Sequence, residues 1–235
     1  MKPLVLCYHA LAERDPHRMA VRLDALRNQL RLLLKRRYQP VGAEDAVAGR
    51  SRTFHVTFDD AFRSVMLAVP LLEELRVPAT VFVCSSYARD GRPLDVPELR
   101  ADVTADPHGF ETLGWPALRE LAERGLEIAG HTVSHPHLPQ LGDVELDREL
   151  ADSRAEIESE LGRSCRYLAY PYGDEDERVR RAARRTGYEA AFALNPGRGR
   201  VDRFALPRLD LYRRHTPVRF WLLTSAVRRR VAFGA

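Results

Sequence analysis

Short apolar runs that alternate with stretches of helical periodicity constrain this chain more than any other feature. Residues 4–8 form an apolar run of strand length, and leucines then recur at helical spacing over residues 23–34. The same strand-then-helix order is repeated by an apolar run at 54–58 and a helical pattern at 65–75. Residues 79–84 then form a run that is apolar enough for a strand buried on both faces. Repeated β–α alternation favours a parallel sheet, either closed into a barrel or open and doubly wound.

The alternation continues in the second half of the chain after one interruption. Residues 85–112 contain an Asp-Gly pair and three prolines, which predicts an inserted loop. We expect one α/β domain over residues 1–235, with this inserted loop and a basic C-terminal segment at 217–235. Further helices are expected at 115–124, 144–161 and 175–186, and further strands at 126–129, 167–170 and 188–194.

Composition excludes several classes of protein. The chain has 235 residues, of which 45% are hydrophobic and 30% charged, so it can bury a sizeable core and is neither disordered nor fibrous. No apolar run has the length of a membrane span, and the N-terminal run is too short for a secretion signal, which predicts a cytoplasmic protein.

The charge pattern and the cysteines argue against two further classes. The net charge is +4, and almost all of the basic residues are arginines. Acidic residues are interleaved with these arginines, so we expect no nucleic-acid partner. The three cysteines, Cys7, Cys84 and Cys165, stand far apart in apolar contexts. This spacing predicts buried free thiols rather than a disulfide framework.

Two polar clusters directly follow predicted strands. Asp59 and Asp60 end the run at 54–58, and a single helix cap would explain one aspartate but not two. His131 and His135 follow the strand at 126–129 with a spacing of four residues, and Pro136 favours a loop over a helix. One carboxylate with two imidazoles is a metal-binding set that leaves a position open for water, and the second carboxylate could then act as a base.

Other polar residues near strand ends carry weaker signals. Tyr170-Pro171-Tyr172-Gly173 follows the strand at 167–170 and predicts a turn whose backbone N–H groups could face a site. The remaining histidines are interpreted as surface residues, namely His17, His55, His108, His137 and His215.

The motifs Thr57-Phe58-Asp59-Asp60 and His131-Thr132-Val133-Ser134-His135-Pro136, in this order, resemble those of the polysaccharide deacetylases, the NodB-like family-four carbohydrate esterases. The resemblance runs from Tyr8 to Leu209. It implies a distorted (β/α) barrel of about seven parallel strands. It also implies metal-dependent removal of the N-acetyl group from an N-acetylated amino sugar, such as an N-acetylglucosamine glycan or glycoside.

The resemblance assigns roles to individual residues. Asp59 matches the catalytic base, whereas Asp60, His131 and His135 match the metal ligands. The expected ion is Zn²⁺, with Co²⁺ or Ni²⁺ as alternatives. The ion would polarise the acetamide and activate water while Asp59 removes the proton.

Further assignments rest on the same resemblance. Arg166 together with Pro171-Tyr172 matches an R-x-x-x-x-P-Y motif, and the backbone N–H of Tyr172 would stabilise the oxyanion. The usual late-strand histidine, the general acid, is missing. A circularly permuted branch, which resembles poly-β-1,6-N-acetylglucosamine deacetylases, carries it on the first strand, so we expect His9 to be the acid. Arg208, in Leu206-Pro207-Arg208-Leu209, is expected to hold Asp59 by a charge-assisted pair.

Three alternatives to this function stay open. The chain could hydrolyse another non-peptide C–N bond, such as a formamide or the ring amide of allantoin, or it could bind sugars without catalysis. It could also associate weakly with membranes if residues 217–223 and Arg228-Arg229-Arg230 formed an amphipathic helix on anionic lipid. A last barrel helix with a solvated arginine edge is the favoured interpretation of that segment.

Overall fold

The computed structural model of the chain describes residues 3–14, 17–194 and 202–225. It has a parallel sheet in the order β10-β9-β8-β7-β6-β5-β1-β11, with the short β4 (Gln39–Pro40) paired to β5 outside this order. The strands are β1 (Leu4–Tyr8), β5 (Thr53–Phe58), β6 (Ala79–Val83), β7 (Glu127–Gly130), β8 (Tyr167–Ala169), β9 (Ala190–Ala193), β10 (Leu206–Pro207) and β11 (Leu209–Asp210).

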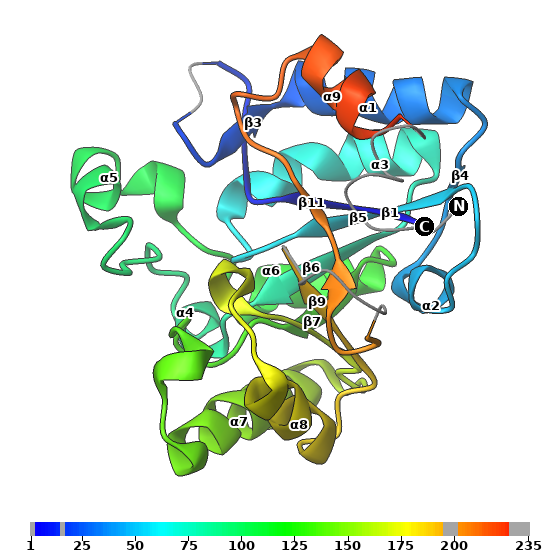
Figure 1. Ribbon diagram of the computed structural model, residues 1–235. Helices are drawn as coiled ribbons and strands as arrows, with labels where there is room; N and C mark the ends of the chain where they lie inside the picture. The colour runs from blue at the N-terminus through cyan, green and yellow to red at the C-terminus, as the bar shows by residue number, and fades with distance from the viewer. Residues whose placement is uncertain (1–2, 15–16, 195–201, 226–235) are drawn as a thin grey trace.

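The sheet closes on itself through one segment. β10 pairs with β9 and β11 pairs with β1, and Arg208 is the single residue between β10 and β11. The Arg208 N–H still donates to the Ala193 carbonyl, whereas the Leu211 N–H donates to the Cys7 carbonyl. β10 and β11 therefore act as one interrupted strand, which confirms the distorted (β/α) barrel with helices around it (Figure 1).

Most expected helices and strands are present within one or two residues of their predicted ends. The pattern at 65–75 begins as a 3₁₀-helix, η1 (Arg63–Ala68), before α3. The surrounding helices are α1 (Leu23–Lys35), α2 (Ala43–Val47), α3 (Val69–Leu75), α6 (Trp115–Glu123), α7 (Asp143–Leu161), α8 (Glu177–Arg185) and α9 (Pro217–Leu223).

The segment at 85–112 is more ordered than the predicted loop. It contains α4 (Ser85–Ala88), α5 (Arg100–Ala105) and the 3₁₀-helix η2 (His108–Phe110). Leu94 and Phe110 are buried in a separate cluster with Ala10 and Ala20, which belong to a small parallel sheet of β2 (Ala10–Ala12) and β3 (Ala20–Arg22). Its own apolar core gives this insertion its structure, and the proline and glycine pattern did not reveal that core.

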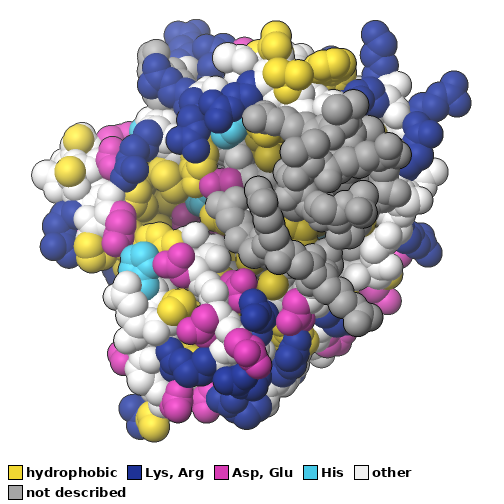
Figure 2. All heavy atoms as spheres, viewed as in Figure 1, with side chains coloured by type: hydrophobic (Ala, Val, Ile, Leu, Met, Phe, Trp, Pro, Cys, Tyr) yellow, Lys and Arg dark blue, Asp and Glu magenta, His cyan; other side chains and the backbone are white. Residues whose placement is uncertain are grey.

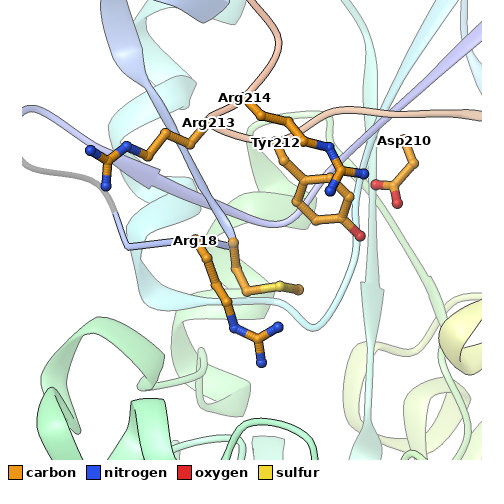
Figure 3. A pocket seen from close by; sticks show the side chains of 6 residues that line it. Arg18, Asp210, Tyr212, Arg213 and Arg214 are labelled. Atoms are coloured by element: carbon orange, nitrogen blue, oxygen red, sulfur yellow. The ribbon is translucent and has the colours of Figure 1, made fainter.

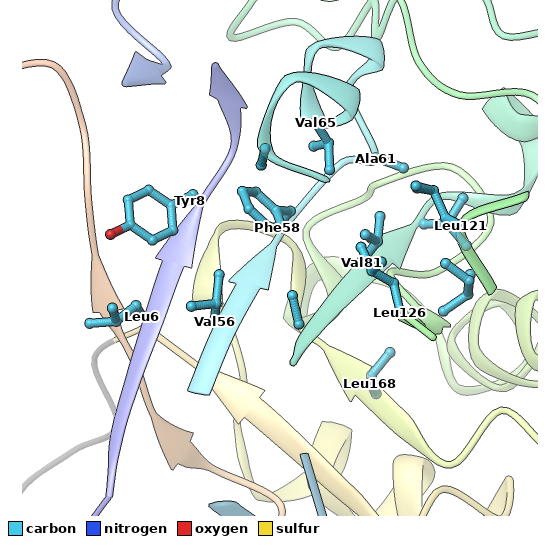
Figure 4. Packing of buried hydrophobic residues seen from close by; sticks show 14 of the residues in the cluster. Leu6, Tyr8, Val56, Phe58, Ala61, Val65, Val81, Leu121, Leu126 and Leu168 are labelled. Carbon is cyan, nitrogen blue, oxygen red and sulfur yellow. The ribbon is translucent and has the colours of Figure 1, made fainter. Parts of the chain in front are cut away.

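Apolar side chains form two cores because alternate residues of each strand point to opposite faces of the sheet. Leu6, Tyr8 and Phe58 belong to the core between sheet and helices (Figure 4). A second cluster contains Val5 and Phe82 together with residues of β7, β8, β9 and α2. The alternation places Cys7 and His9 on the same face as Val5, inside the barrel.

Two histidines expected at the surface are buried. His55 on β5 is 1% exposed, and His215 before α9 is 8% exposed. Both predictions were wrong because single histidines carry no periodic signal of their own. Cys7, Cys84 and Cys165 are buried and free, as predicted.

The C-terminal helix α9 packs against the barrel. Its Phe220 is fully buried, and Arg36, the residue after α1, donates to Thr224 Oγ1 at 2.8 Å. Val218 and Trp221 remain exposed, whereas Arg228-Arg229-Arg230 lies outside the described residues. This packing agrees with a last barrel helix. In the described ranges no helix has the length and apolarity to cross a membrane.

Candidate active site

The predicted polar clusters meet at the carboxyl end of the barrel. His9 follows β1, Asp59 and Asp60 follow β5, and His131 follows β7. Tyr8 and Phe58 are register partners in neighbouring strands, so His9 and Asp59 leave the sheet side by side. These four side chains and His135 are at most 8% exposed, and such burial of ionisable groups requires partners.

Asp60 and the two histidines form a compact group of three donors. Asp60 Oδ1 lies 3.4 Å from His131 Nε2 and 3.3 Å from His135 Nε2. His131 Nδ1 lies 2.8 Å from the Ala169 carbonyl oxygen, which can only accept a hydrogen bond. Nδ1 therefore carries the hydrogen, and Nε2 keeps its lone pair in the neutral ring. Asp60 Oδ1 is buried and has no hydrogen-bond partner among the described residues. Two histidine Nε2 atoms and a carboxylate oxygen that converge in this way fit a divalent cation.

The backbone around this group adopts uncommon conformations. Asp60, Thr132, His135 and Tyr172 have φ values of 66°, 71°, 64° and 60°, in the left-handed region that non-glycine residues rarely adopt. The turn at Asp60 lets two adjacent aspartates face different partners. Left-handed residues of this kind concentrate at functional sites, where the surrounding structure holds them in place.

Asp59 is held by Arg208 rather than by the histidines. The guanidinium donates at 2.6 Å to Oδ1 and at 2.7 Å to Oδ2, and the Cys7 thiol lies 3.4 Å from Oδ2. Burial would raise the pKa of Asp59, but the Arg208 charge, assisted by His131, outweighs it and lowers the pKa. Asp59 is therefore ionised at neutral pH, and the predicted pair with Arg208 is present.

His9 lies between Asp59 and a second acid. Ligand atoms of Cys7, His9 and Asp59 lie within 4.8 Å of one another, and His9 Nδ1 is 3.8 Å from Asp210 Oδ1. The His9 ring stacks on Tyr212 at 5.3 Å between centroids. Because the Arg208 cation already occupies both oxygens of Asp59, the Asp60 group is the better candidate for a metal.

Tyr172 reaches the site from the turn after β8. Its ring packs edge-on against His135 at 4.5 Å and stacks on His137 at 3.9 Å. Its hydroxyl donates to Glu98 Oε2 at 2.7 Å, so a residue of the inserted segment is tied to the site. The Tyr172 ring thus lies beside His135, one of the candidate ligands.

Arg166 is not brought to the site, which corrects the motif-based prediction. It precedes β8, whose other end faces the site, and its guanidinium donates to Glu189 at 2.8 and 2.9 Å and to Glu44 at 3.2 Å. Arg166 stands directly before β8, at the end of the strand opposite to the site.

Sequence reasoning missed Asp210, Tyr212 and Glu98. Asp210 stands two residues after Arg208, so strand alternation could have placed both side chains inside the barrel. Glu98 lies in the segment predicted as a loop, and no local pattern connects it with Tyr172.

Fold and site together define a closed (β/α) barrel with a buried two-histidine, one-carboxylate group at the carboxyl ends of its strands. The family model for polysaccharide deacetylase matches residues 46–191, and the chain belongs to this family. Among curated relatives, a chitooligosaccharide deacetylase of Sinorhizobium fredii is 30% identical over 122 residues, which are 51% of this chain and 46% of the relative. The chain spans about half the length of the first curated relatives it matches.

Solved structures share the whole fold at low sequence identity. The Streptococcus pyogenes deacetylase PplD has a TM-score of 0.77 at 20% identity, and the comparison covers 96% of this chain and 99% of that one. IcaB from Ammonifex degensii has a TM-score of 0.76 at 24% identity, with 94% and 95% of the two chains covered. These similarities establish the fold.

Proposed function

We propose that this chain is a metal-dependent hydrolase that removes the acetyl group from an N-acetylated amino sugar. The observation that carries the proposal is the approach of Asp60 Oδ1 to two histidine Nε2 atoms beside an ionised Asp59. Membership of the polysaccharide deacetylase family supports the substrate class. An amide hydrolase needs an electrophilic centre and a base next to each other. An ion held by Asp60 and the two histidines would supply the first, and Asp59 supplies the second.

Asp60, His131 and His135 would hold the ion, for which Zn²⁺ is the expected candidate because it accepts two imidazoles and one carboxylate. When bound, the ion would polarise the acetamide carbonyl and lower the pKa of water nearby. The lowered pKa of Asp60 keeps this ligand ionised, because the two imidazoles outweigh the effect of burial.

The other residues of the site divide the proton transfers between them. Asp59 accepts the proton of the water that adds to the carbonyl carbon, and Arg208 keeps Asp59 ionised and oriented. The backbone N–H of Tyr172 donates to the carbonyl oxygen as negative charge develops there. His9 donates a proton to the nitrogen as the C–N bond breaks, so that acetate and the free amine leave.

The test measures acetate release from N-acetylated sugars by protein loaded with Zn²⁺, with the variant Asp59→Asn as the matched control. The substrates include polymeric, oligomeric and nucleotide-linked amino sugars. We expect release by the wild type and a loss of about 10³-fold in kcat for Asp59→Asn, within the usual range for a general base. Metal content measured on both proteins should be equal.

The competing functions predict different results in the same experiment. A formamide or allantoin-type hydrolase would leave the sugars intact and release product from those other substrates. A non-catalytic sugar binder would bind the glycans without any release of acetate. Either result, with metal bound, would replace the proposed function.

A further inference from the structure

A pocket of about 600 Å³, whose lining side chains Figure 3 shows, includes two residues that contact the proposed general acid His9. Its walls are Arg18, Met19, Asp210, Tyr212, Arg213 and Arg214. Two of these residues contact His9 directly, since Asp210 lies 3.8 Å from its Nδ1 and the Tyr212 ring stacks on its imidazole. Asp210 and Tyr212 therefore separate the pocket from His9 by a single layer of side chains, and the pocket is large enough for a charged substituent of a sugar.

Basic side chains outnumber acidic ones in the lining of this pocket. Three arginines and one aspartate, Asp210, line it. Asp210 already interacts with His9 and the Tyr212 hydroxyl, and Arg18 is paired with Asp102, which lies outside the lining. Figure 2 shows Lys and Arg side chains gathered along one rim of the hollow on this face. A pocket with this charge balance attracts anions.

Two of the arginines are held in defined positions. Arg18 donates to Asp102 Oδ2 at 2.9 Å and to the Glu98 carbonyl at 2.6 Å, so the inserted segment fixes it. The Arg214 guanidinium lies 5.1 Å from the centre of the Tyr212 ring, on a residue that itself stacks on His9. No carboxylate of the described residues forms an ion pair with Arg214. Arg89 and Arg124, by contrast, are paired with glutamates.

We infer that this pocket is a subsite for a phosphoryl group carried by the amino-sugar substrate. This inference rests on the proposed function and narrows its substrate class from N-acetylated sugars in general to those with a phosphate beside the reacting unit. Phosphate oxygens match the fork of N–H donors of an arginine, and Arg214, which forms no ion pair with a carboxylate of the described residues, can offer this fork to a negatively charged group. A sugar phosphate monoester and a nucleotide diphosphate sugar present the same oxygens.

The kinetic test compares three probes on zinc-loaded protein: methyl N-acetylglucosaminide, N-acetylglucosamine 1-phosphate and its uridine diphosphate derivative. We expect kcat/KM to be about tenfold or more higher for a phosphorylated probe, mainly through KM. In Arg214→Gln the ratio of kcat/KM for the phosphorylated probe to kcat/KM for the neutral probe should fall toward one. The matched control is Arg219→Gln, which removes the same charge from an exposed position of α9 and should leave the ratio unchanged.

A binding measurement separates the subsite from the proposed function. Calorimetric titration of chelator-treated wild type with inorganic phosphate should show binding that Arg214→Gln weakens and Arg219→Gln does not. If phosphate binds in this way but no sugar releases acetate, the proposed function fails and the anion subsite stands.

Other outcomes overturn the subsite. The subsite would be rejected if kcat/KM were equal for neutral and phosphorylated probes and the affinity for phosphate were unchanged in Arg214→Gln. The proposed deacetylation would not be affected by that result. The subsite would also be rejected if Arg219→Gln lowered the preference for the phosphorylated probe as much as Arg214→Gln does. That result would indicate general attraction of anions by a basic surface. A preference for the diphosphate probe over the monoester would assign the pocket to nucleotide sugars, and the reverse to sugar phosphates.

Discussion

The two ends of the barrel interior bury polar side chains in different ways. At the amino end, His55 Nδ1 lies 2.8 Å from the Val41 carbonyl and Nε2 lies 3.0 Å from Thr80 Oγ1, which is 3.5 Å from Glu127 Oε2. At the carboxyl end, Asp59 is bound by the Arg208 cation and Asp60 faces two histidines. Strand alternation turns His55, Thr80 and Glu127 inward, whereas Asp60 reaches the histidines through the left-handed turn that follows β5.

The buried ionisable groups at the two ends of the barrel interior differ in their protonation state. Burial lowers the pKa of His55 to about 4 and raises the pKa of Glu127 to about 7, so desolvation favours the neutral form of each. Around Asp59 and Asp60, neighbouring charges outweigh desolvation and keep the carboxylates ionised. The comparison teaches that burial alone does not mark a site. Buried carboxylates that remain ionised do mark a site, especially where one carboxylate oxygen, here Asp60 Oδ1, accepts no hydrogen bond.

Removal of a ligand at the carboxyl end should have the largest effect. In His131→Ala we expect the zinc content of the purified protein to fall and acetate release to drop to background, because two donors hold the ion far more weakly than three. Metal analysis and activity are measured on the same sample. His55→Ala at the amino end is the comparison variant, and it should keep its zinc even if its stability falls. Equal zinc in wild type and His131→Ala would refute the assignment of the ligands.

Loss of the proposed acid should have the next largest effect. His9→Ala should lower kcat by about 10²-fold, since the amine then leaves without a proton. Its zinc content should match that of the wild type because His9 is not among the three ligands. If His9→Ala loses its zinc together with its activity, His9 is a ligand and the acid lies elsewhere.

The amino end should respond in stability rather than in catalysis. The folded pKa of Glu127, about 7, lies above the ordinary value of 4.5, so the native state binds the proton more tightly than the unfolded state. The contribution of Glu127 is therefore most favourable below pH 4.5 and is lost as the pH rises toward 7. Glu127→Gln should raise the free energy of unfolding by about 2 kcal/mol at pH 8 and by little at pH 4.5.

Urea unfolding at several pH values measures this difference between wild type and Glu127→Gln. The exposed Glu123, on α6, provides the control variant Glu123→Gln, for which we expect no such pH dependence. A stability difference that stays constant across this pH range would show that Glu127 remains ionised in the folded protein.

The smallest effect is expected for Arg166. Because its partners are Glu189 and Glu44, Arg166→Gln should change kcat less than about twofold and should cost at most about 1 kcal/mol of stability, as for other partly exposed ion pairs. Arg208→Gln is the contrasting variant, since it leaves a buried Asp59 without its cation. A large loss of kcat in Arg166→Gln at unchanged stability would restore the motif-based role.

Local sequence patterns were sufficient for most of the longer strands and helices and for the two principal clusters, but not for the helices of the segment at 85–112. The period of the apolar residues distinguishes strands from helices, and the paired aspartates and spaced histidines each lie within a few residues of one strand end. Since parallel strands align their carboxyl ends, the meeting of Asp60 with His131 and His135 follows from local information plus the parallel fold.

Contacts between distant residues required the folded barrel. Arg208 and Asp59 are 149 positions apart, and they meet because the chain changes strand partner at Arg208 and so closes the sheet. The same closure brings Asp210 and Tyr212 to His9, and the packing of the inserted segment brings Glu98 to Tyr172. Periodicity specifies which face of an element is apolar, but strand partners and register depend on the summed packing of the whole barrel.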